Sequence, residues 1–211
     1  MSFVKICGTT SLDDALLAHA AGADAVGFVF AASPRRVDAD TVAAIVASLP
    51  DDLLTVGVFR GAGVEEITAT VARSGVGAVQ LHGDESAAVA AAVRPVAPFL
   101  VQCFTAADPR LAHLEEYPVD AILVDGPRPG SGETVDWSAV AGLSTRRRLL
   151  LAGGLTADNV AEAVARVRPW GVDVVSGVEA SPGRKDPLEL QRFVAAARKS
   201  LSEFSIDPGA A

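Results

Sequence analysis

Residues 3–30, FVKICGTTSLDDALLAHAAGADAVGFVF, contain the unit from which the whole fold can be predicted. A short apolar and branched run at 3–7 is followed by an Ala-rich stretch at 11–21 with helical spacing, and a second apolar run follows at 24–30. Ser11 stands where a serine caps the start of a helix. Continuous apolar runs on both sides of an amphipathic helix are typical of parallel strands covered by helices. The stretch therefore predicts a strand, a helix and a second, parallel strand.

The same alternation occurs eight times along the chain. The predicted strands cover residues 3–7, 24–30, 54–59, 77–82, 98–104, 120–125, 148–152 and 172–176. The predicted helices cover residues 11–21, 38–49, 63–73, 85–93, 108–116, 136–141, 157–167 and 187–203. Eight units predict an α/β fold, a single (βα)8 TIM barrel with eight parallel strands and outer helices. The unit of about 26 residues is compact for a fold that usually needs ~250 residues.

A doubly wound open sheet is the competing architecture for any such alternation. The eight regular units, with no GxGxxG after the first strand, favour the closed barrel. We expect one barrel domain over residues 1–204 and a loose C-terminal tail over residues 205–211, where Pro and Gly occur.

Composition and charge exclude several classes of protein. A formal net charge of −8 argues against a nucleic-acid surface, which needs clustered Lys and Arg. Two cysteines are too few for a disulfide framework and indicate a reducing compartment. The chain shows no signal-type N-terminus and no apolar run near the ~20 residues of a membrane span. We expect a cytoplasmic protein with no nucleic-acid or membrane partner.

The catalytic groups of a TIM barrel lie at the C-terminal ends of its strands, where this sequence places Cys7 and Asp125. Side chains alternate across a strand, so Lys5 and Cys7 share one face of the first strand. The same alternation turns Asp125 inward if Ile122 and Val124 meet the helices. A thiol and a carboxyl would then face one cavity from nearly opposite sides.

That pair suits proton transfer, although a carboxyl normally loses its proton before a thiol does. An inward Lys5 would favour the thiolate of Cys7, and a dry cavity would favour a protonated Asp125. Two ordinary interpretations stay open. A strand-end cysteine is more often a buried small hydrophobe, and a strand-end aspartate more often caps the following turn.

Glycines at two neighbouring strand ends predict a phosphate site. LAGGLTADNV (151–160) ends the seventh strand with Gly153 and Gly154, and VVSGVE (174–179) follows the eighth with Ser176 and Gly177. Backbone N–H groups of these two loops form the usual phosphate site of the fold. The alternative is that the glycines only permit tight turns. A small phosphorylated molecule is the expected partner.

Several motifs, in this order along nearly the whole chain, resemble those of the phosphoribosylanthranilate isomerase family. They are VKICGTT (4–10), GFVF with SPRRV (27–37), VGVF (56–59), VQLHGDE (79–85), ILVDGPRPGSGETVDW (122–137), LAGGLTADNV (151–160) and GVDVVSGVEASPGRKDP (171–187). The resemblance implies an isomerase of tryptophan biosynthesis that needs no metal or organic cofactor. Its reaction is the Amadori rearrangement of N-(5-phosphoribosyl)anthranilate to 1-(2-carboxyphenylamino)-1-deoxyribulose 5-phosphate. A monomer and a homodimer are both compatible with it.

The resemblance also implies roles for individual residues. Asp125 would be the general acid and Cys7 the general base, while Gly153, Gly154, Ser176 and Gly177 would hold the phosphate. Arg35, with Arg36 as the alternative, would meet the anthranilate carboxylate, which suits a guanidinium fork. His82 would line the cavity, although a structural histidine is an equal alternative.

Other positions are assigned more simply or depart from the family pattern. We expect Cys103 to pack in its strand, and Lys185 and Asp186 to fix the last loop by an ion pair, with substrate contact as the alternative. The family's GG[ST]GK loop is here PGSGE (129–133), and Val175 replaces a frequent serine.

Three rival functions remain open at this stage. The aminoimidazole isomerase of histidine biosynthesis performs the same chemistry on a substrate with two phosphates, but would need an Asp at position 7 and a second phosphate site. A lyase or aldolase would form a Schiff base through Lys5. A non-catalytic phosphate-binding scaffold is the third.

Overall fold

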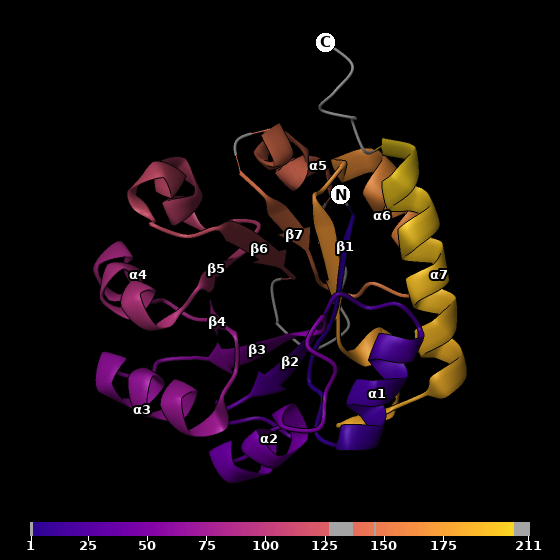
Figure 1. Ribbon diagram of the computed structural model, residues 1–211. Coiled ribbons are helices and arrows are strands. Elements are labelled where there is room, and N and C mark those ends of the chain that lie inside the picture. The colour runs from indigo at the N-terminus through magenta and orange to yellow at the C-terminus, as the bar shows by residue number, and fades with distance from the viewer. Residues whose placement is uncertain (1, 127–136, 146, 205–211) are drawn as a thin grey trace.

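The computed structural model describes residues 2–126, 137–145 and 147–204 and contains a closed barrel of eight parallel strands (Figure 1). The strands follow one another around the barrel in sequence order, and β8 pairs with β1 to close it. They are β1 (Phe3–Ile6), β2 (Ala25–Val29), β3 (Leu54–Phe59), β4 (Ala78–Leu81), β5 (Phe99–Thr105), β6 (Ala121–Asp125), β7 (Leu149–Leu151) and β8 (Gly171–Val174). The predicted (βα)8 TIM barrel is confirmed. The expected tail at 205–211 lies outside the described residues.

Helices cover the outside of the barrel (Figure 1). The α-helices are α1 (Leu12–Ala20), α2 (Ala39–Val46), α3 (Val64–Ser74), α4 (Ala87–Val93), α5 (Trp137–Val140), α6 (Val160–Val167) and α7 (Pro187–Phe204). The 3-10 helices are η1 (Arg94–Val96), η2 (Pro109–Glu116), η3 (Ala141–Thr145) and η4 (Ser176–Val178). The side chain of Ser11 caps α1 as predicted, and that of Asp38 caps α2 in the same way, each accepting a backbone N–H of the first turn.

The helix predictions were wrong in detail at two places. The segment predicted as a helix over 108–116 is the 3-10 helix η2, interrupted at His113, whose φ of −121° is not helical. The helix predicted from 157 begins only at Val160, because Asn159 uses its side chain to shape the preceding turn. Its Oδ1 accepts from the backbone N–H of Thr156 at 2.8 Å, and its Nδ2 donates to the carbonyl of Gly154 at 2.9 Å.

The alternation of side chains along the strands divides the core as predicted. Val4 and Ile6 of β1 and Ile122 and Val124 of β6 pack in the large cluster between the barrel and its helices. Ala121 and Leu123 belong to a separate cluster inside the barrel. The inward row therefore reaches the mouth of the barrel at Cys7, which follows β1, and at Asp125, the last residue of β6, and both residues face one cavity.

Two aspartates at the N-terminal ends of the strands stabilise the opposite face of the barrel. Asp24 accepts from the backbone N–H of Val4 at 2.7 Å and pairs with Arg198. Asp120 accepts from the backbone N–H of Leu100 at 2.8 Å and pairs with Arg94. These carboxylates satisfy the backbone donors of the second residues of β1 and β5, so this face serves stability.

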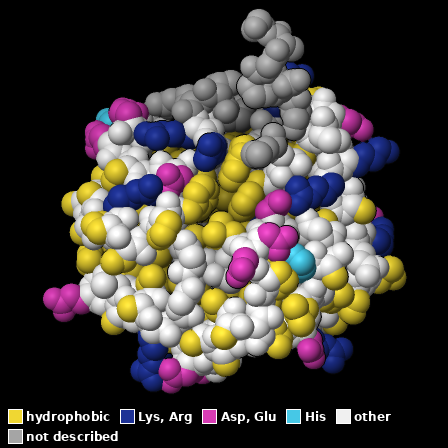
Figure 2. Space-filling model, in the orientation of Figure 1, with side chains coloured by type: hydrophobic (Ala, Val, Ile, Leu, Met, Phe, Trp, Pro, Cys, Tyr) yellow, Lys and Arg dark blue, Asp and Glu magenta, His cyan; other side chains and the backbone are white. Residues whose placement is uncertain are grey.

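The surface carries charges of both signs. In the face drawn in Figure 2, hydrophobic side chains gather near the middle, and basic and acidic side chains alternate around them. No helix in the described part of the chain is long and apolar enough to cross a membrane.

A short antiparallel ribbon follows the barrel and was not predicted. It consists of β9 (Glu179–Ser181) and β10 (Arg184–Lys185), with Arg184 paired to Ser181 and Lys185 to Glu179. Gly183, with a φ of +81°, makes the turn between them. The hydroxyl of Thr10 donates to the carbonyl of Gly183 at 2.5 Å, so the ribbon is tied to the loop after β1.

Candidate active site

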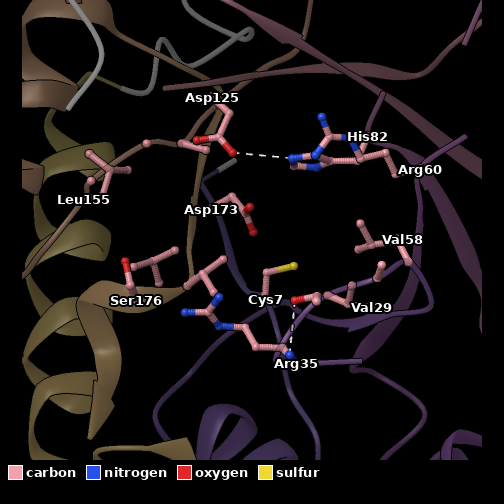
Figure 3. Close-up of a pocket in the computed structure, with 18 residues that line it drawn as sticks. Cys7, Val29, Arg35, Val58, Arg60, His82, Asp125, Leu155, Asp173 and Ser176 are labelled. Atoms are coloured by element: carbon pink, nitrogen blue, oxygen red, sulfur yellow. Dashed lines mark hydrogen bonds and ion pairs between the residues drawn. The ribbon is translucent and has the colours of Figure 1, made fainter. Parts of the chain in front are cut away.

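Cys7 and Asp125 face a single cavity at the C-terminal ends of the strands, as the alternation along β1 and β6 predicts. Figure 3 shows the sulfur and the carboxylate on separate sides of that cavity, with Asp173 between them in this view. Both residues are nearly buried, at 4% and 7% exposure. The other predicted site residues that line the cavity are Arg35, His82, Gly153, Gly154 and Ser176.

A buried cation lies beside Cys7. Lys5, from the same inward row of β1, donates to Asp173 of β8 with an Nζ–Oδ1 distance of 2.7 Å, and both side chains are buried. Burial favours the neutral amine, but the charge of Asp173, with a contribution from Cys7, raises the pKa of Lys5 above its ordinary value. The ion pair with Asp173 therefore holds the lysine as an ammonium, beside the sulfur of Cys7.

The glycine at position 27 leaves room for this arrangement. A Cβ built on Gly27 of β2 would lie 2.6 Å from the sulfur of Cys7 and 3.2 Å from Nζ of Lys5. The thiol of Cys7 and the ammonium of Lys5 therefore both pack against the backbone of Gly27.

His82 accompanies Asp125 on the other side of the cavity. Nε2 of His82 lies 3.5 Å from Oδ2 of Asp125, and Oδ1 of Asp125 accepts the backbone N–H of Gly126 at 2.7 Å. Burial lowers the pKa of His82, but Cys103 and Asp125 raise it more, so the pKa of His82 lies well above its usual value. The imidazole of His82 is thus the basic group nearest to the Asp125 carboxylate among the pairs given above.

Two further side chains fix the imidazole. The side-chain amide of Gln80 lies 2.7 Å from Nδ1 of His82. This amide can pair with Nδ1 whether or not that nitrogen carries a proton, because rotating the amide by 180° exchanges its N–H donor for its oxygen acceptor. Cys103 lies inside the barrel with its sulfur 3.7 Å from Nε2 of His82, and burial raises the pKa of its thiol. The prediction that Cys103 packs in its strand is confirmed, with the addition of this contact.

The loops after β7 and β8 form the candidate phosphate site. Gly153 and Gly154 have φ values of +86° and +63°, a conformation that side-chain-bearing residues rarely adopt. Gly177 does not line the cavity; a Cβ there would lie 1.9 Å from the carbonyl oxygen of Leu155. Gly177 therefore lets the two loops meet, while Gly153, Gly154 and Ser176 present their atoms to the cavity.

Arg35, rather than Arg36, reaches the cavity. Its Nε and Nη2 donate to both carboxylate oxygens of Glu179, at 2.7 to 3.1 Å. Arg36 instead lines a neighbouring hollow between the loops after β2 and β3. The predicted ion pair between Lys185 and Asp186 was wrong: Lys185 pairs with Glu179 at 3.1 Å, and Asp186 caps α7 through the backbone N–H groups of Leu188 and Glu189.

Sequence reasoning missed three charged residues of the site. Asp173 could have been found, because the alternation along β8 turns it inward between Val172 and Val174. Arg60, directly after β3, lines the cavity, but nothing in the local pattern singles it out. Glu179 belongs to the motif at 171–187, but no role of its own was predicted for it from the sequence. The altered loop at 129–133 lies outside the described residues.

The remaining lining is apolar except for Ser33. The apolar members are Val29, Ala31, Ala32, Val58, Ala152, Leu155, Val174 and Val175. Within the described ranges, no group of three or more His, Cys, Asp or Glu residues is placed to hold a metal ion.

Comparison with known proteins gives concordant matches. The family model for N-(5'phosphoribosyl)anthranilate (PRA) isomerase matches residues 4–196. A relative from Pelobacter propionicus, named N-(5'-phosphoribosyl)anthranilate isomerase, is 44% identical over 207 residues, which are 95% of this chain and 97% of the relative.

Two solved structures match over similar lengths. One is a phosphoribosyl anthranilate isomerase in complex with reduced 1-(o-carboxyphenylamino)-1-deoxyribulose 5-phosphate, with a TM-score of 0.84 and 36% identity, covering 94% of this chain and 100% of the other. The second contains monomers of the dimeric isomerase from Thermotoga maritima, with a TM-score of 0.84, 36% identity and coverage of 94% and 100%.

Proposed function

The chain belongs to the N-(5'-phosphoribosyl)anthranilate isomerase family, and on this premise we propose that Asp125 and Cys7 are the general acid and general base of its reaction. The reaction is the Amadori rearrangement of N-(5-phosphoribosyl)anthranilate to 1-(2-carboxyphenylamino)-1-deoxyribulose 5-phosphate in tryptophan biosynthesis. The observation that carries the assignment is the convergence of Cys7 and Asp125 on one largely apolar cavity.

In the first step, Asp125 donates a proton to the ring oxygen of the ribose. The bond between C1' and this oxygen breaks with its electron pair going to oxygen, and the nitrogen lone pair forms an iminium with C1'. The imidazole of His82, 3.5 Å away, stabilises the carboxylate that remains. His82 therefore acts through Asp125, as well as bordering the substrate.

In the second step, the thiolate of Cys7 removes the proton from C2'. The electrons of that C–H bond form the C1'–C2' double bond, and the iminium electrons return to nitrogen to give an enolamine. Tautomerisation to the ketone completes an isomerisation in which no atom is gained or lost. The ammonium of Lys5, held by Asp173, lies beside the sulfur that performs this step.

Two anchors at the ends of the substrate hold it between these groups. Arg35 is proposed to meet the anthranilate carboxylate, and Gly153, Gly154 and Ser176 the phosphate, with Gly177 shaping the loop. Anchoring both ends fixes the reacting carbons between acid and base, and such orientation lowers the barrier substantially.

The burial of Lys5 argues against the Schiff-base alternative. An imine requires a neutral amine, whereas this lysine is ion-paired with Asp173 and its pKa is raised. The thiol at position 7, where the histidine-pathway isomerase would need a carboxylate, argues against that substrate.

Further parts of the proposal follow from the family and the surface. We propose a barrel domain over 1–204 with a C-terminal tail at 205–211, acting on a phosphorylated small molecule without metal or organic cofactor. We propose a cytoplasmic location, no nucleic-acid or membrane partner, and a monomer or homodimer.

Kinetics of Cys7→Ala and Asp125→Asn test the roles. Each variant should lower kcat by about two to four orders of magnitude, with circular dichroism unchanged. The exposed Glu162→Gln is the matched control and should behave as wild type. Wild-type kcat in either catalytic variant would disprove the assignment. Turnover of the histidine-pathway substrate, measured in parallel, would show relaxed specificity.

A further inference from the structure

The ribbon after the barrel connects the two sides of the site through one buried carboxylate. Glu179, at the start of β9, binds Nε and Nη2 of Arg35 on one side and Nζ of Lys185 on the other. The side chains of Glu179 and Lys185 are 3% and 0% exposed, and that of Arg35 is 11% exposed. This cluster of three, Arg35, Glu179 and Lys185, is called the ribbon triad below.

The triad also holds the backbone of the proposed base. Nζ of Lys185 donates to the carbonyl oxygen of Cys7 at 2.5 Å. On the same side, Arg35 passes directly over Gly8, where a Cβ would come within 2.6 Å of its Cδ. Both the carboxylate-binding arginine and the residue that carries the thiol are thus fixed by contacts with the ribbon.

Two basic side chains share the one carboxylate of the triad. Burial lowers the pKa of Lys185 more than its pairing with Glu179 raises it. Burial raises the pKa of Glu179, but the hydrogen bonds and charges of Arg35 and Lys185 outweigh it and hold that pKa below its usual range. Glu179 engages Nε and Nη2, which leaves the Nη1 edge of the guanidinium for a ligand in the cavity that Arg35 lines.

We propose that Glu179 and Lys185 are positioning residues with separate targets: Glu179 aims Arg35 at the substrate carboxylate, and Lys185 sets the position of Cys7. This inference rests on the proposed roles of Cys7 and Arg35. It predicts that substrate binding and turnover can be impaired separately by changing neighbouring members of one buried cluster.

Anthranilate and inorganic phosphate are suitable probes, because each occupies one end of the proposed site as an inhibitor. Glu179→Gln should raise the inhibition constant of anthranilate and the KM of the substrate by about tenfold, while inhibition by phosphate stays unchanged. Lys185→Met keeps the apolar stem but loses both polar contacts. It should lower kcat by about tenfold or more, with anthranilate inhibition within about twofold of wild type.

A double-variant cycle separates positioning from a general structural role. In an Arg35→Ala background, Glu179→Gln should cause no further change in anthranilate inhibition, because its target is gone. Glu179→Asp keeps the charge with a shorter reach and should change inhibition in the same direction by less, so it replaces Glu179→Gln if that variant does not fold. Glu162→Gln, which removes an exposed carboxylate paired with Arg166, is the control for the loss of one negative charge.

The proposal would be overturned if both Glu179 variants melted at a lower temperature but kept the anthranilate inhibition of wild type. It would also be overturned if Lys185→Met melted at a lower temperature but kept the kcat of wild type per folded molecule. Cys7→Ala and Arg35→Ala are measured in the same series. If they retain wild-type kinetics, the proposed function itself fails. If they lose turnover and binding while the Glu179 and Lys185 variants do not, only the positioning roles fail.

Discussion

Replacing Gly27 with alanine should displace the sulfur of Cys7 while leaving the substrate anchors in place. The new Cβ would lie 2.6 Å from that sulfur and 3.3 Å from Cα of Cys7. Unbonded heavy atoms of this kind prefer about 3.5–4.0 Å, so the sulfur has to move by about 1 Å or adopt another rotamer. Lys5, whose Nζ would be 3.2 Å from the same Cβ, limits retreat on that side.

The size of the effect follows from this displacement. A misplacement of about 1 Å at a reacting group is enough for a loss of about 100-fold in rate. We therefore expect kcat of Gly27→Ala to fall about 100-fold, with KM within about twofold of wild type, because the three atoms nearest to the new Cβ belong to Cys7 and Lys5.

Steady-state kinetics with a melting curve measures both quantities, and the neighbouring strand offers a matched control. A Cβ at Gly57 of β3 would lie 3.0 Å from ring atoms of Phe30 and Phe59, away from the thiol. Gly57→Ala should lower stability by about 1–3 kcal/mol through overpacking and leave kcat near wild type. A folded Gly27→Ala variant with kcat within about threefold of wild type would refute the idea that the position of this sulfur limits the rate.

Three further predictions concern the loops and the buried charges. Gly177→Ala puts a Cβ 1.9 Å from the carbonyl oxygen of Leu155, so the loops after β7 and β8 have to separate. This separation should raise KM and weaken inhibition by phosphate by about tenfold or more. Unchanged values would show that these loops do not form the phosphate site. Lys5→Met should lower the free energy of unfolding by about 3–5 kcal/mol, since Asp173 stays buried without its cation, and adding Asp173→Leu should restore much of the loss. Urea denaturation measures the stability of the single and the double variant. No recovery of stability in the double variant would contradict the ion-pair argument. Asp120→Asn should lower the free energy of unfolding at pH 7 by about 1–3 kcal/mol. Burial raises the pKa of this carboxyl, but its guanidinium and backbone N–H partners lower that pKa below the usual value. The stabilisation is therefore complete above the unfolded-state pKa of about 4 and disappears as the pH falls through the folded-state pKa. Urea denaturation from pH 7 to 2.5 should show the two proteins converging in acid; a constant gap would exclude ionisation as the cause.

The barrel and the convergence of Cys7 and Asp125 on one cavity were predictable because they depend on local patterns. Eight apolar runs and the alternation of side chains along β1 and β6 were sufficient to turn Cys7 and Asp125 into one cavity. Glycine spacing located Gly153 and Gly154, although it did not separate their role from that of Gly177, which serves contact between loops.

What the sequence did not predict depends on contacts between distant parts of the chain. Arg35 and Glu179 are 144 positions apart, and Lys185 and the carbonyl of Cys7 are 178 apart. No periodicity connects such positions, so Lys185 was assigned to its neighbour Asp186 instead. The ribbon itself is too short to have a pattern of its own and exists because Thr10 and the triad hold it.

The positions of Lys5 and His82 bear on how one cavity can combine a carboxyl as the proposed acid with a thiol as the proposed base, although a carboxyl is normally the stronger acid of the two. Lys5 is fixed beside the sulfur by its ion pair with the buried Asp173, so its charge is present throughout the proposed reaction. His82 differs, because it can itself gain or lose a proton and lies 3.5 Å from Asp125. In the proposed first step, the proton that Asp125 gives to the ring oxygen leaves a carboxylate, and the imidazole of His82 faces that carboxylate at 3.5 Å. The permanent cation therefore lies beside the proposed base, and the group beside the proposed acid is one that can itself exchange protons.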